Sequence, residues 1–141
     1  MHNEKVNVDF WIRLLSISTR LSFERARTRA IEEIDRYGDL IDPVEKITLA
    51  RNCDVPEWLT PAYERICMRI KPLDLDEAKV VGMETAVLLG QAREAIRKRS
   101  IKDSPKHPPL KSRPNPLYDN IDPSLVTRTV KETFWRYTQG L

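Results

Sequence analysis

Prolines are concentrated in one short part of the chain, and this limits the possible folds more than any other feature. Five of the ten prolines lie between residues 105 and 116, namely Pro105, Pro108, Pro109, Pro114 and Pro116. Each proline lacks an amide donor and fixes φ, so a helix cannot continue through such a stretch. We therefore predict a Pro-rich linker at residues 101–121, between an N-terminal region, 1–100, and a C-terminal segment, 122–141.

Helix signals begin soon after the N-terminus. Asp9 is predicted to cap a first helix that ends near Arg20, and Ser22 to cap a second helix that stops at Gly38. The apolar residues of the first helix are dense enough to predict burial on most of its sides: Phe10, Ile12, Leu14, Leu15 and Ile17. The second helix carries one apolar stripe, made of Phe23, Ala26, Ala30, Ile31 and Ile34.

Two further helices are predicted to start at proline. Asp42-Pro43 places a capping carboxylate before a proline at the first helical position, and this third helix should end before Pro56. Thr60-Pro61 starts a fourth helix, which Lys71-Pro72 closes. Its inward side is predicted to carry Ala62, Tyr63, Ile66, Cys67 and Ile70.

A capping box precedes the fifth helix. Asp74 is followed three residues later by Glu77, which predicts a short helix that ends at Gly82. The longest helix is predicted at residues 83–99, with Ile101 past its end. A groove of small residues that could admit a neighbouring backbone is predicted from the spacing of Ala86, Val87, Gly90, Arg93 and Ile96.

The pattern of the whole chain predicts an all-α fold. No segment shows the alternation of β-branched residues between hairpin turns that strands require, and the four glycines offer few tight turns. Beyond the linker, one helix is predicted at residues 123–138. The expected architecture is a small helical bundle of five or six helices, a Pro-rich basic linker and one C-terminal amphipathic helix.

Positive charge is concentrated around the linker. The chain as a whole carries a net charge of +3, whereas residues 92–114 hold eight lysines and arginines against two carboxylates. This segment could attract phosphates or an acidic protein surface, or could be a linker kept extended by like charges. The predicted basic patch comprises Arg93, Arg97, Lys98, Arg99, Lys102, Lys106, Lys111 and Arg113.

Large apolar side chains mark candidate partner-binding residues. Trp58 has two interpretations, a core anchor that closes the bundle or an exposed aromatic that binds a partner. The C-terminal helix has an apolar stripe that can dock on its own bundle or on another chain. Its candidates are Leu125, Val126, Val130, Phe134, Trp135 and Tyr137.

The residues that carry chemistry are few and scattered. His2 and His107 lie in segments predicted to be flexible, where no rigid surroundings would hold them against a substrate or metal. Cys53 and Cys67 match no zinc spacing and are expected to be free thiols. The glycines form no phosphate-binding loop. We therefore expect no catalytic residues, no cofactor and no metal, and a chain that is not an enzyme.

Two short runs, DPVEKI at residues 42–47 and VPEWL at residues 55–59, carry a family resemblance together with Lys71-Pro72-Leu73. Over roughly residues 10–99 the chain resembles the helical region that follows the BTB/POZ domain in many fungal, chiefly basidiomycete, proteins. The resemblance implies an α-helical extension that works in protein–protein association. In the wider BTB class such extensions help to build adaptor surfaces, sometimes for cullin-type ubiquitin ligases. The BTB fold itself is not expected within this chain.

The leading hypothesis is a non-enzymatic protein–protein interaction module or adaptor fragment with a protein partner of unknown identity. Exchange of the C-terminal helix between two copies would make it a homo-oligomer. The alternative is a nucleic-acid- or chromatin-associated protein that uses residues 93–113. No apolar run is long enough to span a membrane and no signal peptide is evident, so we expect no membrane partner and an intracellular location, cytoplasmic or nuclear.

Overall fold

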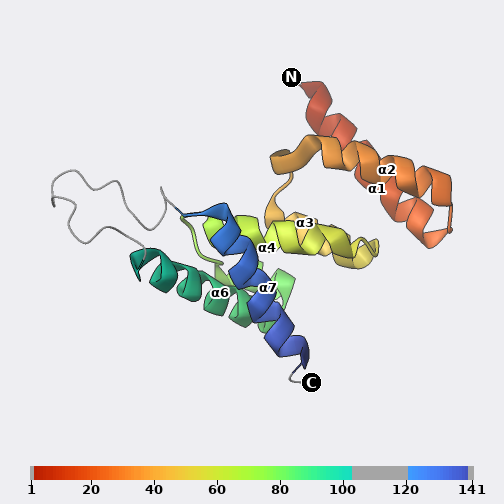
Figure 1. Ribbon diagram of the computed structural model, residues 1–141. Helices are drawn as coiled ribbons and strands as arrows, with labels where there is room; N and C mark the ends of the chain where they lie inside the picture. Colours follow the sequence, from red (N-terminus) through yellow and green to blue (C-terminus); the bar gives the residue numbers. More distant parts are fainter. Residues whose placement is uncertain (1, 103–120, 140–141) are drawn as a thin grey trace. The chain divides into compact units, whose positions relative to one another are not determined.

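The computed structural model describes residues 2–102 and 121–139, with side chains at 7–100 and 121–137. These residues form seven α-helices and two short 3-10 helices, and none of them belongs to a strand (Figure 1). The predicted all-α class is therefore confirmed. The chain divides into two compact units, Met1–Trp58 and Leu59–Leu141. The last helix thus shares a unit with the helices that precede the predicted linker, whereas the sequence had placed it in a segment of its own.

The first unit begins with a helical hairpin of α1 (His2–Arg20) and α2 (Glu24–Tyr37). The predicted cap at Asp9 is wrong, since residues 2–8 contain no proline or glycine to stop the helix and α1 runs back to His2. The predicted cap at Ser22 is also wrong, because Ser22 has a φ of +59° and Phe23 occupies the cap position without a side-chain hydrogen bond. A left-handed residue reverses the chain between the helices, but it cannot adopt the extended backbone of a cap.

Burial in this hairpin is one-sided. Leu15 of α1 and Ala30 and Ile34 of α2 are completely buried, whereas the side chains of Phe10 and Ile17 are 57% and 50% exposed. The prediction that α1 is buried on most sides is therefore wrong. A helix that packs mainly on one neighbour covers only the stripe that faces that neighbour.

The rest of the first unit follows the predicted capping signals. Gly38 ends α2 with a φ of +50° and opens the 3-10 helix η1 (Gly38–Leu40). Helix α3 (Pro43–Asn52) begins as predicted, because an oxygen of the Asp42 carboxylate accepts the amides of Val44 at 3.0 Å and Glu45 at 3.3 Å. Helix α3 ends before Pro56 as predicted, and the second 3-10 helix, η2 (Pro56–Trp58), follows it.

The second unit contains α4 (Leu59–Met68), α5 (Leu75–Val81), α6 (Met83–Lys102) and α7 (Pro123–Gln139). Helix α6 is central, because α4, α5 and α7 all pack against it, and α7 also packs against α4 (Figure 1). The buried apolar residues of this unit are Ala62, Tyr63, Ile66, Cys67, Val81, Leu88, Leu89, Ala92, Ile96, Ile121, Leu125, Val126 and Val130.

The helix limits of the second unit agree with the sequence where a local cap defines them. The Asp74–Glu77 capping box is present, and Gly82 ends α5 with a φ of +92°. Two limits are wrong, since Ile70 lies beyond α4 with its side chain 70% exposed, and Ile101 lies inside α6.

The predicted backbone groove on α6 is also wrong. A Cβ atom placed on Gly90 would meet nothing within 4 Å, so no backbone approaches there. Val87 is likewise exposed, whereas Leu88, Leu89 and Ala92 are buried. The buried stripe of α6 is thus turned by about a third of a helical turn from the predicted one.

The cap of α3 gives a test of local stability. Replacing Asp42 with alanine removes the acceptor for two amides and should lower the free energy of unfolding by about 1 kcal/mol. Asp42→Asn is the matched control, because asparagine caps a helix equally well. Its free energy of unfolding should lie within about 0.3 kcal/mol of the wild-type value. Urea denaturation measures both, and equal losses in the two variants would contradict the capping role.

Candidate interaction site

Helix α7 docks on its own chain through the apolar stripe that the sequence singled out. Leu125, Val126 and Val130 are buried, with exposed fractions of 6%, 1% and 1%. Phe134 continues the stripe by stacking on Tyr63 of α4, with ring centroids 4.4 Å apart and the rings nearly parallel. The structure therefore brings four of the six candidate residues of this helix together against the α4 and α6 surface.

The other two candidates of α7 lie differently. The side chain of Trp135 is 64% exposed, so it points away from the docked stripe. Tyr137 is half-buried and donates its hydroxyl hydrogen bond to the Glu84 carboxylate of α6, an interaction that raises the pKa of Tyr137. Tyr137 therefore helps to hold the end of α7 beside the start of α6, while Trp135 adds aromatic surface.

Arg99 provides a polar contact between α6 and α7. Its guanidinium donates to the Thr129 hydroxyl at 2.9 Å and to the Glu132 carboxylate at 3.0 Å. Thr129 is buried among the apolar residues of α7, so its hydroxyl needs a partner there. Arg99 thus stabilises the docked position of α7.

Arg93 holds the end of α4. Its side chain is only 7% exposed, and its guanidinium donates to the carbonyl oxygens of Arg69 at 2.6 Å and Ile70 at 2.7 Å. Weaker donations reach the carbonyls of Ile66 at 3.2 Å and Lys71 at 3.5 Å. Ile66 lies in the last turn of α4, whereas the other three carbonyls follow the helix. Arg93 of α6 therefore holds both the last turn of α4 and the segment that leaves it.

These contacts correct the predicted basic patch. Arg93 is not a surface cation, and Arg99 is used between helices, because an arginine near a helix end or a carboxylate can serve the fold as well as a ligand. Lys98 is exposed and pairs with Glu94 at 3.7 Å, and Arg97 is half-buried. Lys106, Lys111, Arg113 and the side chain of Lys102 lie outside the described residues. Of the proposed contacts of the nucleic-acid alternative, Arg93 is therefore buried, while the side chain of Arg99 is 37% exposed.

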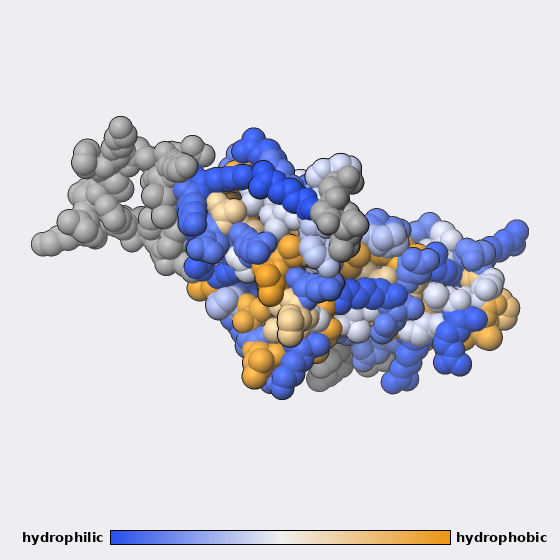
Figure 2. All heavy atoms as spheres, turned by 90° about the horizontal axis from the view of Figure 1, so that it is seen from below, coloured by the Kyte–Doolittle hydropathy of each residue, from blue (hydrophilic) through white to orange (hydrophobic). Residues whose placement is uncertain are grey.

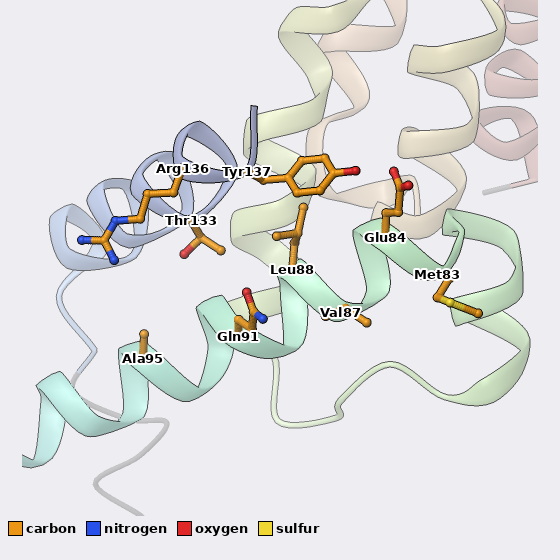
Figure 3. A pocket seen from close by; sticks show the side chains of 9 residues that line it. All are labelled: Met83, Glu84, Val87, Leu88, Gln91, Ala95, Thr133, Arg136 and Tyr137. Carbon is orange, nitrogen blue, oxygen red and sulfur yellow. The ribbon is translucent and has the colours of Figure 1, made fainter. Parts of the chain in front are cut away.

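A groove of about 610 Å³ lies between α6 and α7 (Figure 3). Its apolar wall comes from one side of α6, where Met83 is 82% and Val87 53% exposed. Glu84 and Arg136 place opposite charges at its edges. The remaining lining residues are Leu88, Gln91, Ala95, Thr133 and Tyr137.

The groove residues were largely missed from the sequence. Met83 and Val87 are four residues apart on α6 and could have been recognised as a second apolar line beside the buried one. The opposing residues on α7 depend on how the two helices pack, which no local pattern contains. Figure 2 shows hydrophobic residues gathered among hydrophilic ones on the face of the molecule that it views.

Trp58 is a buried residue of the first unit, as the core-anchor interpretation expects. Its indole N–H donates to the Asp35 carboxylate of α2 at 2.7 Å, and the Lys46 ammonium of α3 lies 4.0 Å from the ring centroid. The side chain is only 6% exposed. Trp58 therefore joins α2 and α3 through a hydrogen bond and a cation–π contact.

The remaining sequence candidates for chemistry are placed as follows. Cys53 and Cys67 are buried free thiols, and burial raises the pKa of Cys67 to about 12, which keeps its thiol protonated at neutral pH. His2 begins α1 instead of lying in a flexible segment, and His107 is outside the described residues. Among the described residues, no group of three or more potential ligands is arranged to hold a metal ion. Within the same residues, no helix is both long enough and apolar enough to span a membrane.

The role of Arg93 can be tested by stability. Arg93→Met keeps the aliphatic volume but removes the donor to the carbonyls of Ile66, Arg69 and Ile70, and should lower the free energy of unfolding by about 2–3 kcal/mol. Lys98→Met, on the exposed face of the same helix, should change it by less than about 0.5 kcal/mol. If chemical denaturation gave the same small effect for both variants, Arg93 would not hold the end of α4.

Docking of α7 can be tested with its buried and exposed residues. Leu125→Ala removes a buried side chain and should cost about 2–4 kcal/mol of unfolding free energy, whereas Trp135→Ala should cost less than about 1 kcal/mol. Thermal and urea denaturation of the full chain measure both. Equal effects would contradict the arrangement in which Leu125 faces the bundle and Trp135 faces away.

No protein-family model, no curated protein and no solved structure matches this chain. The resemblance to the helical region that follows BTB/POZ domains therefore stays a prediction.

Proposed function

We propose that this chain is a non-enzymatic protein–protein interaction module, and that the groove between α6 and α7 binds an apolar helix of a partner protein. The single observation that carries the proposal is the apolar wall of the groove, where Met83 and Val87 are 82% and 53% exposed. Grooves between packed helices commonly accept the apolar face of another helix, whose side chains at spacings of three and four residues fill them.

The walls of the groove support a preformed binding site. Arg99 holds α7 to α6 through Thr129 and Glu132, and the Tyr137–Glu84 hydrogen bond joins the two helices at one end of the groove. A preformed groove costs less conformational entropy on binding than one that must assemble. The edge charges of Glu84 and Arg136 are opposite, so they can orient a partner helix without demanding one sign of charge.

Self-association is a second way in which this unit could work. The stripe of Leu125, Val126 and Val130 that docks on α4 and α6 would fit the same surface of a second copy. Because residues 103–120 connect α6 to α7, exchange requires α7 to leave its own unit first. The effective concentration of the tethered helix favours docking within one chain at low protein concentration.

The adaptor interpretation rests on the resemblance of residues 10–99 to post-BTB helical regions. In that class the helical extension contributes surface to a larger assembly. A groove on the second unit agrees with such a role, since it offers a site for one further protein.

The groove can be tested with a pair of matched valine variants. Val87→Asp places a charge in the apolar wall, whereas Val80→Asp places the same charge on α5, where the valine is 55% exposed and does not line the groove. Affinity capture from the native cell extract, with quantitative mass spectrometry, should give partners that wild type and Val80→Asp retain and that Val87→Asp loses by about tenfold or more.

Circular dichroism should show the same helix content in all three proteins, because both sites are exposed. Capture of the same proteins by all three, at the same level, would exclude the groove as the binding site. Loss of the captured partners by both variants would assign binding to a wider surface that includes α5.

A further inference from the structure

Helix α1 carries a line of apolar side chains that the fold leaves largely exposed, although the Phe10 ring meets that of Trp11 edge-on with centroids 5.0 Å apart. Phe10, Ile17 and Leu21 are 57%, 50% and 55% exposed, and Leu14 lies between them and is half-buried. Leu21 follows α1 directly, and its amide donates to the Ile17 carbonyl at 3.0 Å, so it continues the helical path. We call these four residues the α1 seam.

The spacing of the α1 seam is that of a helix-binding surface. Successive members are four, three and four residues apart, which keeps them within one narrow stripe of a helix. This 4-3-4 spacing is the heptad pattern through which two helices interlock their side chains. The seam therefore has the form of one half of a helix–helix interface.

The α1 seam is distinct from the face that holds α1 in its unit. Among the described side chains of α1, Leu15 and Ser18 are buried, with exposed fractions of 0% and 1%. Each follows a seam residue by one position, which turns it about 100° around the helix. Burial thus follows one line of α1 while the seam follows another.

One border of the α1 seam is basic. Arg13 and Arg20 are both exposed and each directly precedes a seam residue, so both lie on the same border, about 10 Å apart along the helix. The structure records no ion pair for either arginine with any described residue. Asp9 lies on this border as well, which leaves a net charge of +1 there.

We propose that the α1 seam binds an amphipathic helix of a partner protein that presents an apolar heptad stripe bordered by acidic residues seven positions apart. The apolar stripe matches Phe10, Leu14, Ile17 and Leu21, and the acidic border matches Arg13 and Arg20. This site lies on the first unit, so it goes beyond the groove of the second unit and does not depend on it.

A second copy of the chain in an antiparallel arrangement is a poorer occupant. In a two-fold antiparallel pair of α1 helices the same border of each helix faces its counterpart, so Arg13 and Arg20 would face the arginines of the other copy. Like charges across such a border destabilise the pair. An acidic border removes this repulsion and replaces it with attraction.

The interface is small. Helix α1 has 19 residues and is therefore about 28 Å long, which limits the contact to about five turns of a partner helix. Contacts of this size are typical of transient complexes. Measurement of the affinity thus requires protein at micromolar concentration.

The probe is a pair of synthetic 28-residue heptad peptides with leucine at positions a and d, a length of about four heptads. One carries glutamate at e and g and the other carries lysine there, so each peptide repels itself. In fluorescence anisotropy with the full chain, the glutamate peptide should bind about tenfold or more tighter than the lysine peptide. Its binding should weaken as salt is raised, because salt screens exposed charges.

Charge reversal provides the decisive variant. Arg13→Glu/Arg20→Glu should reverse the preference, so that the lysine peptide binds tighter. Arg128→Glu/Lys131→Glu is the matched control, since it makes the same change in net charge at exposed residues of α7. Ile17→Ser should weaken the binding of both peptides. All the substituted side chains are exposed, and circular dichroism checks that helix content is kept.

Three results would overturn the proposal. The first is equal affinity for the two peptides, or an equal effect of the seam and control charge reversals. The second is a dimer of the free chain in sedimentation velocity that Ile17→Ser dissociates, which would assign the seam to a second copy. The third is binding to phosphatidylserine-containing vesicles without binding to the glutamate peptide, which would assign the seam to a membrane surface.

Discussion

The ends of two short helices are held by arginines from other helices, and much of the structure depends on this arrangement. Helices α3 and α4 have ten residues each and end at Asn52 and Met68. Arg27 of α2 donates to the carbonyls of Cys53 and Asp54 beyond α3, and Arg93 of α6 donates to those of Arg69 and Ile70 beyond α4. A guanidinium has five donors in a rigid fork, so one side chain can serve several carbonyls at once. In both units an arginine of another helix therefore anchors the segment that directly follows a short helix.

The second unit shows how this constraint leads to a surface. Arg93 fixes α6 to the end of α4, and Arg99, further along α6, holds α7 through Thr129 and Glu132. The buried line of α6 is covered by these neighbours, so its second apolar line, with Met83 and Val87, is left along the edge of α7. The groove thus follows from two arginines and from a helix whose apolar residues are spread over more than one face.

The sequence predicted some helix ends but was wrong on the caps at Asp9 and Ser22, and it predicted the buried helix faces only in part, for a physical reason. The Asp42 cap, the Asp74–Glu77 box and the left-handed Gly38 and Gly82 are local, because each involves residues within four positions of one another. Which face is buried depends on neighbours that are distant in sequence. The charge count of residues 92–114 placed Arg93 in a basic patch, because such a count does not show which groups each arginine contacts. The partners of Arg93 are carbonyls 22 to 27 residues away in the sequence. The groove was missed for the same reason, since its α7 wall meets α6 only in the folded chain.

Each unit leaves one ordered apolar line uncovered among its described residues, and stability alone does not account for this. The seam residues of α1, and Met83 and Val87 on α6, are largely exposed in the free chain, so they add little burial energy to its folding. Exposed apolar surface also promotes aggregation. Single exposed apolar residues are common on proteins, but lines at helical spacing are what helix-binding surfaces use. The two lines differ in charge, since the border of the seam is basic and the edges of the groove carry both signs. Because the lines lie on separate units, one chain that bound through both would join two different proteins, as an adaptor does.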